Sequence, residues 1–477
     1  MKKLLSLLGT MTIIGSSIPT VVAVSSYNER INLRVNKNNI REVALVSADE
    51  AKNRENRWFR HSEFKPTGYF LEAGIKYEII INKNEYLTNI FFRVGQWGKY
   101  KNINNGHEYF ESFLVIGETS IVIPEYSGVL YIEDNNQTDL EVIDIVTDDS
   151  EEFIKIPTFK INETDQTEFI TQIKTTKSPF VEFVSKHYFA TMQTDMIKNV
   201  VLSRPQHSFN VTLNHWDNVW NWTNDFYGLN AKNKDISKKF PQYIHIANED
   251  NSWGYANATH GRVMFQNSTG AGKDLFLDQI TDQWPLWHET GHTYQTLQYK
   301  WHDLTEVSNN LSALYIQQKL GIQLRIYKES EKQQAIKRYL AQQNENKDFN
   351  NLSGDIGSWI RLGMLWQLQM GFGHNFYPVL NKIYRQINNG KDSESMPRFD
   401  TDEKKIQMFI RITSYVTDYN LKQFFNEWGI KLTAETENII SRYKPLTKPI
   451  WNNIAELKTE FDPIIQEMVP FKLVEIE

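Results

Sequence analysis

The sequence predicts an α+β fold in three parts: a β-sandwich-like N-terminal unit, a mixed central domain and a helical C-terminal region. Short β-rich runs, separated by turn residues, recur between residues 56 and 147. Apolar residues at helical spacing dominate after about residue 177. The chain has 477 residues, of which 40% are hydrophobic and 13% aromatic. That composition is sufficient for a large core and argues against intrinsic disorder.

The N-terminus has the pattern of a signal peptide. Two lysines precede a mostly apolar run from Leu4 to Ile14, which is short for a membrane span, and Ala23 ends a cleavage-site pattern. We therefore predict a signal peptide over 1–23, an uncleaved anchor being the alternative, and a secreted or cell-surface protein. The polar, Asn-rich residues 24–55 are predicted to be a linker. No later segment reaches ~18 continuous apolar residues, so no membrane span is expected after the signal segment.

Three regions follow the linker. The β-rich N-terminal unit is expected over 56–150, the central domain over 165–380 and the helical C-terminal region over 381–477. Three apolar stripes at helical spacing begin at Trp216, Trp359 and Leu421, and they favour core-facing helices. The predicted strands of the N-terminal unit are 77–81, 90–92, 113–116, 121–123, 129–132 and 142–146.

The composition excludes several classes of protein. The chain has 58 acidic and 52 basic residues, a net charge of −6, and therefore lacks the positive field of a general nucleic-acid binder. Cysteine is absent, which excludes disulfide scaffolds, thiolate metal sites and cysteine nucleophiles. Any metal site must therefore use His, Asp and Glu.

One segment carries the residues of a metal site. Residues 284–295 contain a His-Glu-Thr-Gly-His pentapeptide, a His-Glu-x-x-His pattern expected by chance at most about 0.03 times in this chain. On a helix, His288 and His292 share one face, where two imidazoles can bind one metal ion. Glu289 lies beside that ion, placed to take a proton from metal-bound water. Gly291 costs about 1 kcal/mol in a helix interior relative to Ala, so we expect another element to pack closely against it.

A third ligand is expected on the next helix. A catalytic zinc takes three protein ligands and keeps one position open for water. Glu306 follows His292 by 14 residues, which leaves room for a turn and a second helix over 304–315. Two nearby acids, Asp303 and Glu329, fit this pattern less well. Asn310, one turn beyond Glu306, is expected to bond a ligand side chain.

These two segments resemble the enhancin-like zinc metallopeptidases, family sixty of the metallopeptidases, which includes viral enhancins and bacterial mucin-degrading enzymes. That family is marked by His-Glu-x-Gly-His, followed by a Glu that leads a helix of the Glu-Val-x-Asn-Asn-Leu type. Here these motifs are 288–292 and 306–311. The resemblance implies a zincin, gluzincin-like catalytic domain and covers about residues 56–440. Weaker matches lie at 66–69, 128–132, 362–368 and 372–378.

The resemblance assigns a role to each residue of the site. It implies that His288, His292 and Glu306 bind Zn2+ and that Glu289 is the general base. The implied activity is that of a secreted zinc-dependent endopeptidase, and the implied substrate is a mucin-like O-glycosylated protein. His374 and Tyr377, in the matched downstream segment, are candidates for a second group that stabilises the tetrahedral intermediate.

Two further features of the sequence bear on how a substrate could bind. The strand-like run 262–266 could offer a sheet edge to an extended substrate chain. Trp216, Trp220 and Trp222 are read as core residues rather than sugar platforms.

Two alternatives to the endopeptidase stay open. One is a catalytically silent surface adhesin or glycan-binding protein on a peptidase scaffold, favoured by the β-rich unit and the signal segment. Its weakness is that every expected side chain of the metal site is present. The other is a zinc exopeptidase that trims the ends of small peptides.

Overall fold

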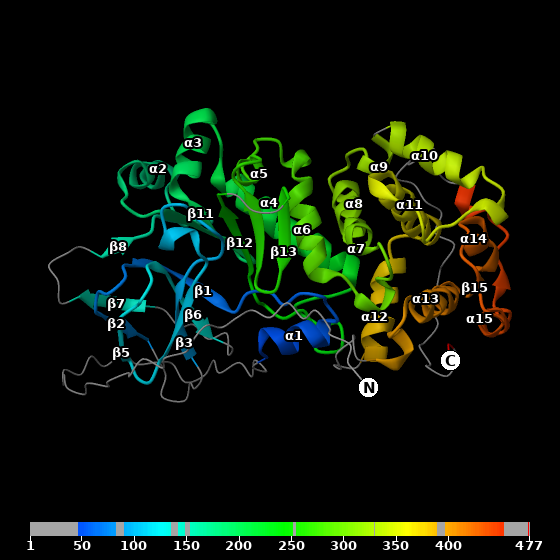
Figure 1. Ribbon diagram of the computed structural model, residues 1–477, viewed down its shortest axis with the longest axis horizontal. Helices are drawn as coiled ribbons and strands as arrows, with labels where there is room; N and C mark the ends of the chain where they lie inside the picture. Colours follow the sequence, from blue (N-terminus) through cyan, green and yellow to red (C-terminus); the bar gives the residue numbers. More distant parts are fainter. Residues whose placement is uncertain are drawn as a thin grey trace, which may run out of the picture.

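The computed structural model describes residues 46–82, 90–134, 142–147, 153–250, 254–328, 330–388, 396–452 and 476. A β-unit lies at one end of the molecule, a six-stranded sheet in the middle and a group of helices at the other end (Figure 1). This arrangement confirms the predicted α+β class. The predicted signal peptide, residues 1–23, lies outside the described residues. In the part that the structure describes, no helix is long and apolar enough to cross a membrane.

The N-terminal β-unit is a sandwich of two antiparallel sheets. One has the strand order β4-β3-β6-β1-β8 and the other β5-β2-β7. Side chains of both sheets, including Ile79, Phe92 and Leu130, meet in one buried core. The predicted strands are therefore confirmed, with small shifts at their ends. The strands are β1 (Phe64–Leu71), β2 (Tyr77–Ile81), β3 (Ile90–Gly95), β4 (Phe110–Leu114), β5 (Thr119–Val122), β6 (Gly128–Asp134), β7 (Val142–Thr147) and β8 (Ile154–Lys155).

The central sheet has the order β13-β14-β12-β11-β10-β9. Strands β11, β12 and β14 run parallel, and the edge strand β13 is antiparallel to β14. One face packs on the β-unit through residues such as Phe180 and Phe189. The other packs on helices through residues such as Val263 and Phe265. The strands are β9 (Thr158–Lys160), β10 (Phe180–Val184), β11 (Tyr188–Gln193), β12 (Ile244–Glu249), β13 (Ala256–Thr259) and β14 (Arg262–Gln266).

Helices cover the second face of this sheet and form the C-terminal region (Figure 1). Trp216 and Trp220 are buried and Trp222 packs against the same core, as predicted. A short parallel pair, β15 (Tyr419–Asn420) and β16 (Lys444–Pro445), lies among the last helices. The helices of the central and C-terminal parts are α2 (Gln166–Thr175), α3 (Thr194–Ser203), α4 (Phe209–Tyr227), α5 (Ala271–Asp274), α6 (Trp284–Tyr294), α7 (Thr305–Ser308), α8 (Asn310–Lys319), α9 (Arg325–Lys328), α10 (Ser330–Leu340), α11 (Gly354–Phe372), α12 (Phe376–Asn388), α13 (Asp402–Thr417), α14 (Lys422–Glu427) and α15 (Ala434–Ile440).

The end of the predicted linker, residues 24–55, is ordered structure. Residues Ala48–Glu55 form helix α1, so the linker prediction is wrong for this part. Glu55 is fully buried, and both of its carboxylate oxygens lie 3.0 Å from the ammonium group of Lys239. Leaving either charge buried without the other would cost several kcal/mol. One charged residue of this polar segment, Glu55, thus forms a buried ion pair with Lys239, which lies 184 residues further along the chain.

Helices α6 and α8 approach one another closely at Gly291. A Cβ atom on Gly291 would lie 2.3 Å from the carbonyl oxygen of Asn309 and 3.0 Å from Oγ of Ser312. The expected close approach at this glycine is therefore confirmed. The helix predicted over 304–315 is divided into α7 and α8, which adjoin at Asn309.

Replacement of Gly291 by alanine should destabilise the protein, although alanine is the better helix former. The methyl group gains about 1 kcal/mol in helix propensity, but it forces the backbone of α8 away at a typical cost of about 1–3 kcal/mol. We expect a lower free energy of unfolding in urea for Gly291→Ala. Gly363→Ala in α11 is the control, because its nearest contact is the end of the flexible Ile336 side chain. Equal stability of the Gly291 variant and the wild type would contradict the packing argument.

Candidate metal centre

Three side chains from α6 and α7 converge on one point. Nε2 of His288 and Nε2 of His292 are 3.1 Å apart. One carboxylate oxygen of Glu306 lies 3.0 Å from the first and 3.3 Å from the second. Within the described ranges, this is the one group of three or more His, Asp or Glu side chains with ligand atoms close enough to share a metal ion, all within 4.8 Å of one another.

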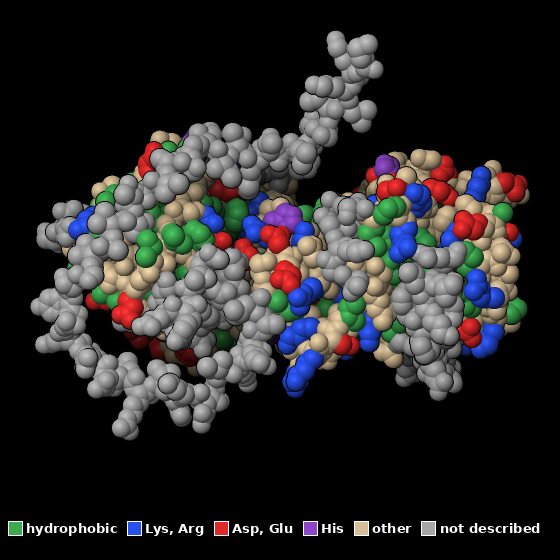
Figure 2. Space-filling view, turned by 90° about the horizontal axis from the view of Figure 1, so that it is seen from below, with side chains coloured by type: hydrophobic (Ala, Val, Ile, Leu, Met, Phe, Trp, Pro, Cys, Tyr) green, Lys and Arg blue, Asp and Glu red, His purple; other side chains and the backbone are tan. Residues whose placement is uncertain are grey.

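Part of this group is open to solvent. The Glu306 side chain is 62% exposed, whereas His292 is nearly buried. In the space-filling view, histidine and acidic side chains adjoin one another near the middle of the face shown (Figure 2). A buried imidazole beside an exposed carboxylate leaves one side of the group accessible. A catalytic metal site needs such an opening for water or substrate.

The hydrogen bonds of the two imidazoles favour metal binding. Nδ1 of His288 lies 2.8 Å from Oδ1 of Asn310, and Nδ1 of His292 lies 2.9 Å from Oε1 of Gln295. Because an amide oxygen only accepts, each Nδ1 carries the proton and donates it. Each Nε2 then presents a lone pair to the shared point. Metal-binding histidines have this arrangement, so the residues present fit a divalent ion.

The amides that hold the imidazoles are themselves held. The Gln295 amide nitrogen donates to the Thr305 carbonyl and to Oγ of Ser308, both at 2.7 Å. The Asn310 amide nitrogen donates to the Glu306 carbonyl at 2.8 Å. The prediction that Asn310 bonds a ligand side chain is confirmed. The role of Gln295 was not predicted from the sequence. Its position one helical turn after His292 is the feature that indicates such a contact.

Glu306 is an anion in this environment. In the metal-free chain its contacts with His288 and His292, whose Nε2 atoms can donate to the carboxylate only when the imidazoles carry a second proton, hold the pKa of the Glu306 carboxyl well below the ordinary value. The side chain therefore stays ionised at any pH near neutrality. An ionised carboxylate beside two neutral imidazoles is a suitable set of ligands for a divalent cation such as zinc.

Glu289 has the opposite environment. It is buried, and one of its carboxylate oxygens has no hydrogen-bond partner among the described residues. Burial raises the pKa of Glu289 to about 7; the neighbouring His288 and, to a smaller extent, Arg262 on β14 oppose this rise, whereas the Glu306 carboxylate adds to it. A carboxylate with so little solvation is a stronger base than an exposed one.

Other candidates from the sequence do not join this group. The phenol of Tyr377 is fully buried and donates to the Leu365 carbonyl at 2.7 Å, which removes it as an electrophile. His374 packs edge-on against Tyr315 of α8, nine residues beyond Glu306. Asp303 forms an ion pair with Arg361 at 3.3 Å. Glu329 lies outside the described residues.

The sheet edge beside the site belongs to β13 and not to β14. The run 262–266 is strand β14, which lies between β12 and β13 with hydrogen bonds on both sides. The expectation that this run offers a free edge is therefore wrong, because β13 folds back antiparallel and covers it. Helix α6 packs against β13, so the actual edge strand runs next to the helix that carries His288 and His292.

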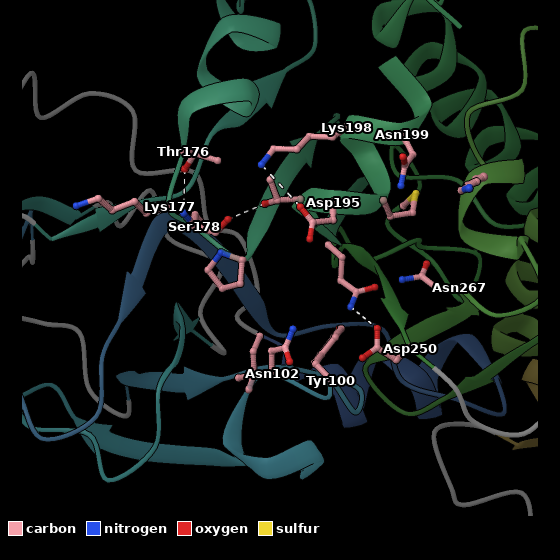
Figure 3. Close-up of a pocket in the computed structure, with 16 residues that line it drawn as sticks. Tyr100, Asn102, Thr176, Lys177, Ser178, Asp195, Lys198, Asn199, Asp250 and Asn267 are labelled. Carbon is pink, nitrogen blue, oxygen red and sulfur yellow. Dashed lines mark hydrogen bonds and ion pairs between the residues drawn. The ribbon is translucent and has the colours of Figure 1, made fainter. Parts of the chain in front are cut away.

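A separate pocket of about 500 Å3 lies at the carboxyl ends of β11, β12 and β14 (Figure 3). Several of its polar groups are already engaged with one another. The Gln193 amide donates to Asp250 at 2.6 Å, and Lys198 lies 3.7 Å from Asp195. The ammonium group of Lys177 points away from the cavity (Figure 3). No residue of the His288–His292–Glu306 group lines this pocket, so it is distinct from the metal centre.

Solved structures with the same fold include bacterial metallopeptidases. The ZmpB metallopeptidase of Clostridium perfringens superposes with a TM-score of 0.68 and 18% identity, over 85% of this chain and 81% of that one. The M60 catalytic domain of ZmpC from the same organism, in complex with the sialyl T antigen, gives a TM-score of 0.66 and 20% identity, over 85% and 80% of the two chains. These likenesses establish the fold.

Comparison of sequences gives the family. A TRPM8 channel-associated factor homolog of Danio rerio is 23% identical over 402 residues, which are 82% of this chain but 40% of that protein. The chain thus spans less than half the length of this curated relative. The family model for peptidase M60, enhancin and enhancin-like proteins matches residues 152–429, more than half of the chain and all of the residues that converge at the metal centre. The chain therefore belongs to the M60, enhancin-like peptidase family.

Proposed function

We propose that this protein is a secreted zinc-dependent endopeptidase that hydrolyses peptide bonds in mucin-like O-glycosylated proteins. The observation that carries the proposal is the convergence of three ligand atoms from His288, His292 and Glu306 beside a buried carboxylate, Glu289. The amide oxygens on both Nδ1 atoms support it, because they leave the lone pair of each neutral imidazole on Nε2, the atom that faces the shared point.

The four residues have two kinds of role in the proposed reaction, three as metal ligands and one as a base. His288, His292 and Glu306 would hold the zinc ion. When bound, zinc would polarise the scissile carbonyl and lower the pKa of water. The Glu289 carboxylate takes a proton from the attacking water and passes it to the leaving amine. Burial of Glu289 favours the proton uptake, because its ionised form is poorly solvated.

The proposed substrate class rests on the relatives and on the predicted signal segment. One structural relative is described in complex with the sialyl T antigen and another with the Tn antigen. Both are glycan antigens, and a secreted enzyme would meet glycoproteins outside the cell. A silent adhesin with the same fold would bind such proteins without cutting them, and an exopeptidase would remove only terminal residues.

We expect one zinc ion per chain, bound by the three converging residues. Glu306→Gln and His292→Ala should each lower the zinc content or weaken zinc affinity at least about tenfold, since each removes a ligand. Metal analysis after dialysis and competition with a chromogenic chelator provide the measurement. Asp303→Asn is the matched control, because that acid is close in sequence and pairs with Arg361 instead. Unchanged zinc affinity in Glu306→Gln would contradict the ligand assignment.

Replacement of Glu289 by glutamine should abolish cleavage and leave zinc in place. The amide is nearly isosteric but cannot accept the proton, so kcat should fall about 10²- to 10⁴-fold. Mass mapping of cut sites on O-glycosylated protein and on the same protein after enzymatic deglycosylation is the measurement.

The same experiment separates the alternatives. Internal cuts restricted to glycosylated material support the proposal, whereas loss of terminal residues alone indicates an exopeptidase. Binding without cleavage by the zinc-loaded wild type indicates an adhesin, and full activity of Glu289→Gln would rule out this residue as the base.

The protonation of Glu289 should set how the reaction rate falls at low pH. Below its pKa the carboxyl is protonated and cannot accept a proton, so kcat/KM should fall as pH decreases. Burial raises this pKa to about 7 in the metal-free chain, and a bound dication would lower it. The midpoint is therefore expected at or below about pH 7. Zinc content must be checked at each pH, because protonation of the histidines releases metal. If kcat/KM of the residual activity of Glu289→Gln fell with the same midpoint, the assignment of Glu289 as the base would be contradicted.

A further inference from the structure

An aromatic side chain from outside the matched family region lies against the metal centre. Trp58 belongs to the segment between α1 and β1, upstream of the β-unit, whereas the family match begins at residue 152. Its ring meets the His292 ring edge-on, with centroids 6.4 Å apart and planes at 66°. This is an attractive geometry for two aromatic rings.

The backbone on the N-terminal side of Trp58 is fixed to the central domain. The side chains of Asn56 and Gln298 exchange two hydrogen bonds, of 2.9 and 2.8 Å. Arg57 bonds the carboxylate of Glu55, which is fully buried with Lys239. Gln298 follows the end of α6 closely. The segment is thus held at the same place where α6 presents His292.

The C-terminal side of Trp58 is fixed to α6 itself. Nε2 of His61 lies 3.1 Å from Oγ1 of Thr293, the residue next to His292. Both atoms are buried. Trp58 is therefore held between two anchors, one at each side in sequence, and both anchors lie on or beside the C-terminal end of α6.

Two further groups contact the Trp58 ring. The Phe59 ring stacks on it with centroids 4.2 Å apart and planes at 19°. The Lys300 ammonium group lies 4.1 Å from the ring centroid. The same ammonium donates to Oγ1 of Thr305 at 3.1 Å, directly before Glu306 in sequence.

We infer that Trp58 is a positioning residue for the metal ligand His292. Held by its contacts with Phe59 and Lys300, the Trp58 ring blocks rotation of the His292 imidazole away from the shared point. Gln295 holds Nδ1 of that imidazole, and the amide nitrogen of Asn309 lies 3.1 Å from Nε2, the atom that a metal ion would take. Through Lys300, the same stack contacts the segment that carries Glu306. The inference rests on the proposed zinc site, and it makes the upstream segment a part of that site.

The test measures the metal and not only catalysis. Full-length Trp58→Ala should bind zinc about tenfold more weakly in chelator competition, the size of effect typical of groups that orient a metal ligand. With Co2+ in place of zinc, its visible absorption bands should shift, because they report ligand geometry. Trp58→Phe should give a smaller effect of the same sign. Tyr126→Ala is the control, since Tyr126 stacks on Tyr109 in the β-unit at 4.0 Å and does not contact the metal centre.

The outcomes separate the two proposals. If the wild type binds no zinc, the proposed function fails, and the inference about Trp58 fails with it. If the wild type binds zinc and both Trp58 variants match its affinity and cobalt spectrum, the inference alone is overturned, even when stability or cleavage declines. If Trp58→Ala does not fold, Trp58→Phe decides by the same two measurements. Weaker zinc binding with an altered cobalt spectrum, absent from Tyr126→Ala, supports the inference.

Discussion

The close approach of α6 and α8 at Gly291 is the constraint on which the site depends. Two imidazoles on one helix and a carboxylate at the start of the next can meet only if the two backbones come nearly into contact. The Asn309 carbonyl occupies the space that any side chain at position 291 would need. The same approach brings Asn310 within hydrogen-bond distance of His288. The absence of a side chain at Gly291 therefore allows the three converging side chains to meet. It also allows Asn310 to bond one of them, His288.

The two carboxylates of the site owe their different chemistry to their surroundings. Glu306 is exposed and bonded to two imidazoles, so its pKa falls and it stays an anion. Glu289 is buried with an unbonded oxygen, so its pKa rises to about 7. A ligand needs a fixed negative charge, whereas a base must take up and release a proton near neutrality. In the proposed function, burial and hydrogen bonding would thus suit two glutamates on neighbouring helices to these two roles.

The site is also tied to parts of the chain that lie far from it in sequence. A third hydrophobic core joins the β-unit to the central sheet, through residues such as Tyr131 and Phe189. The buried pair of Glu55 and Lys239 attaches the N-terminal segment to the central domain. Both are interactions between regions separated by more than 50 residues. They explain how a segment ahead of the β-unit can contact His292.

The sequence by itself determined the fold class, six of the eight strands of the β-unit and the two histidines that share a helix face, because each follows from local periodicity or from a fixed spacing along a helix. It missed β1 and β8, and Glu306 was singled out by the motif of the family. It also predicted that Gly291 and Asn310 serve contacts between elements. Only the tertiary structure decided which strand forms the sheet edge, that Tyr377 is committed to a backbone carbonyl, and that the end of the predicted linker is a helix with a buried charge. Each of these depends on a partner distant in sequence, as with Glu55 and Lys239, and local patterns do not record which distant residues will meet.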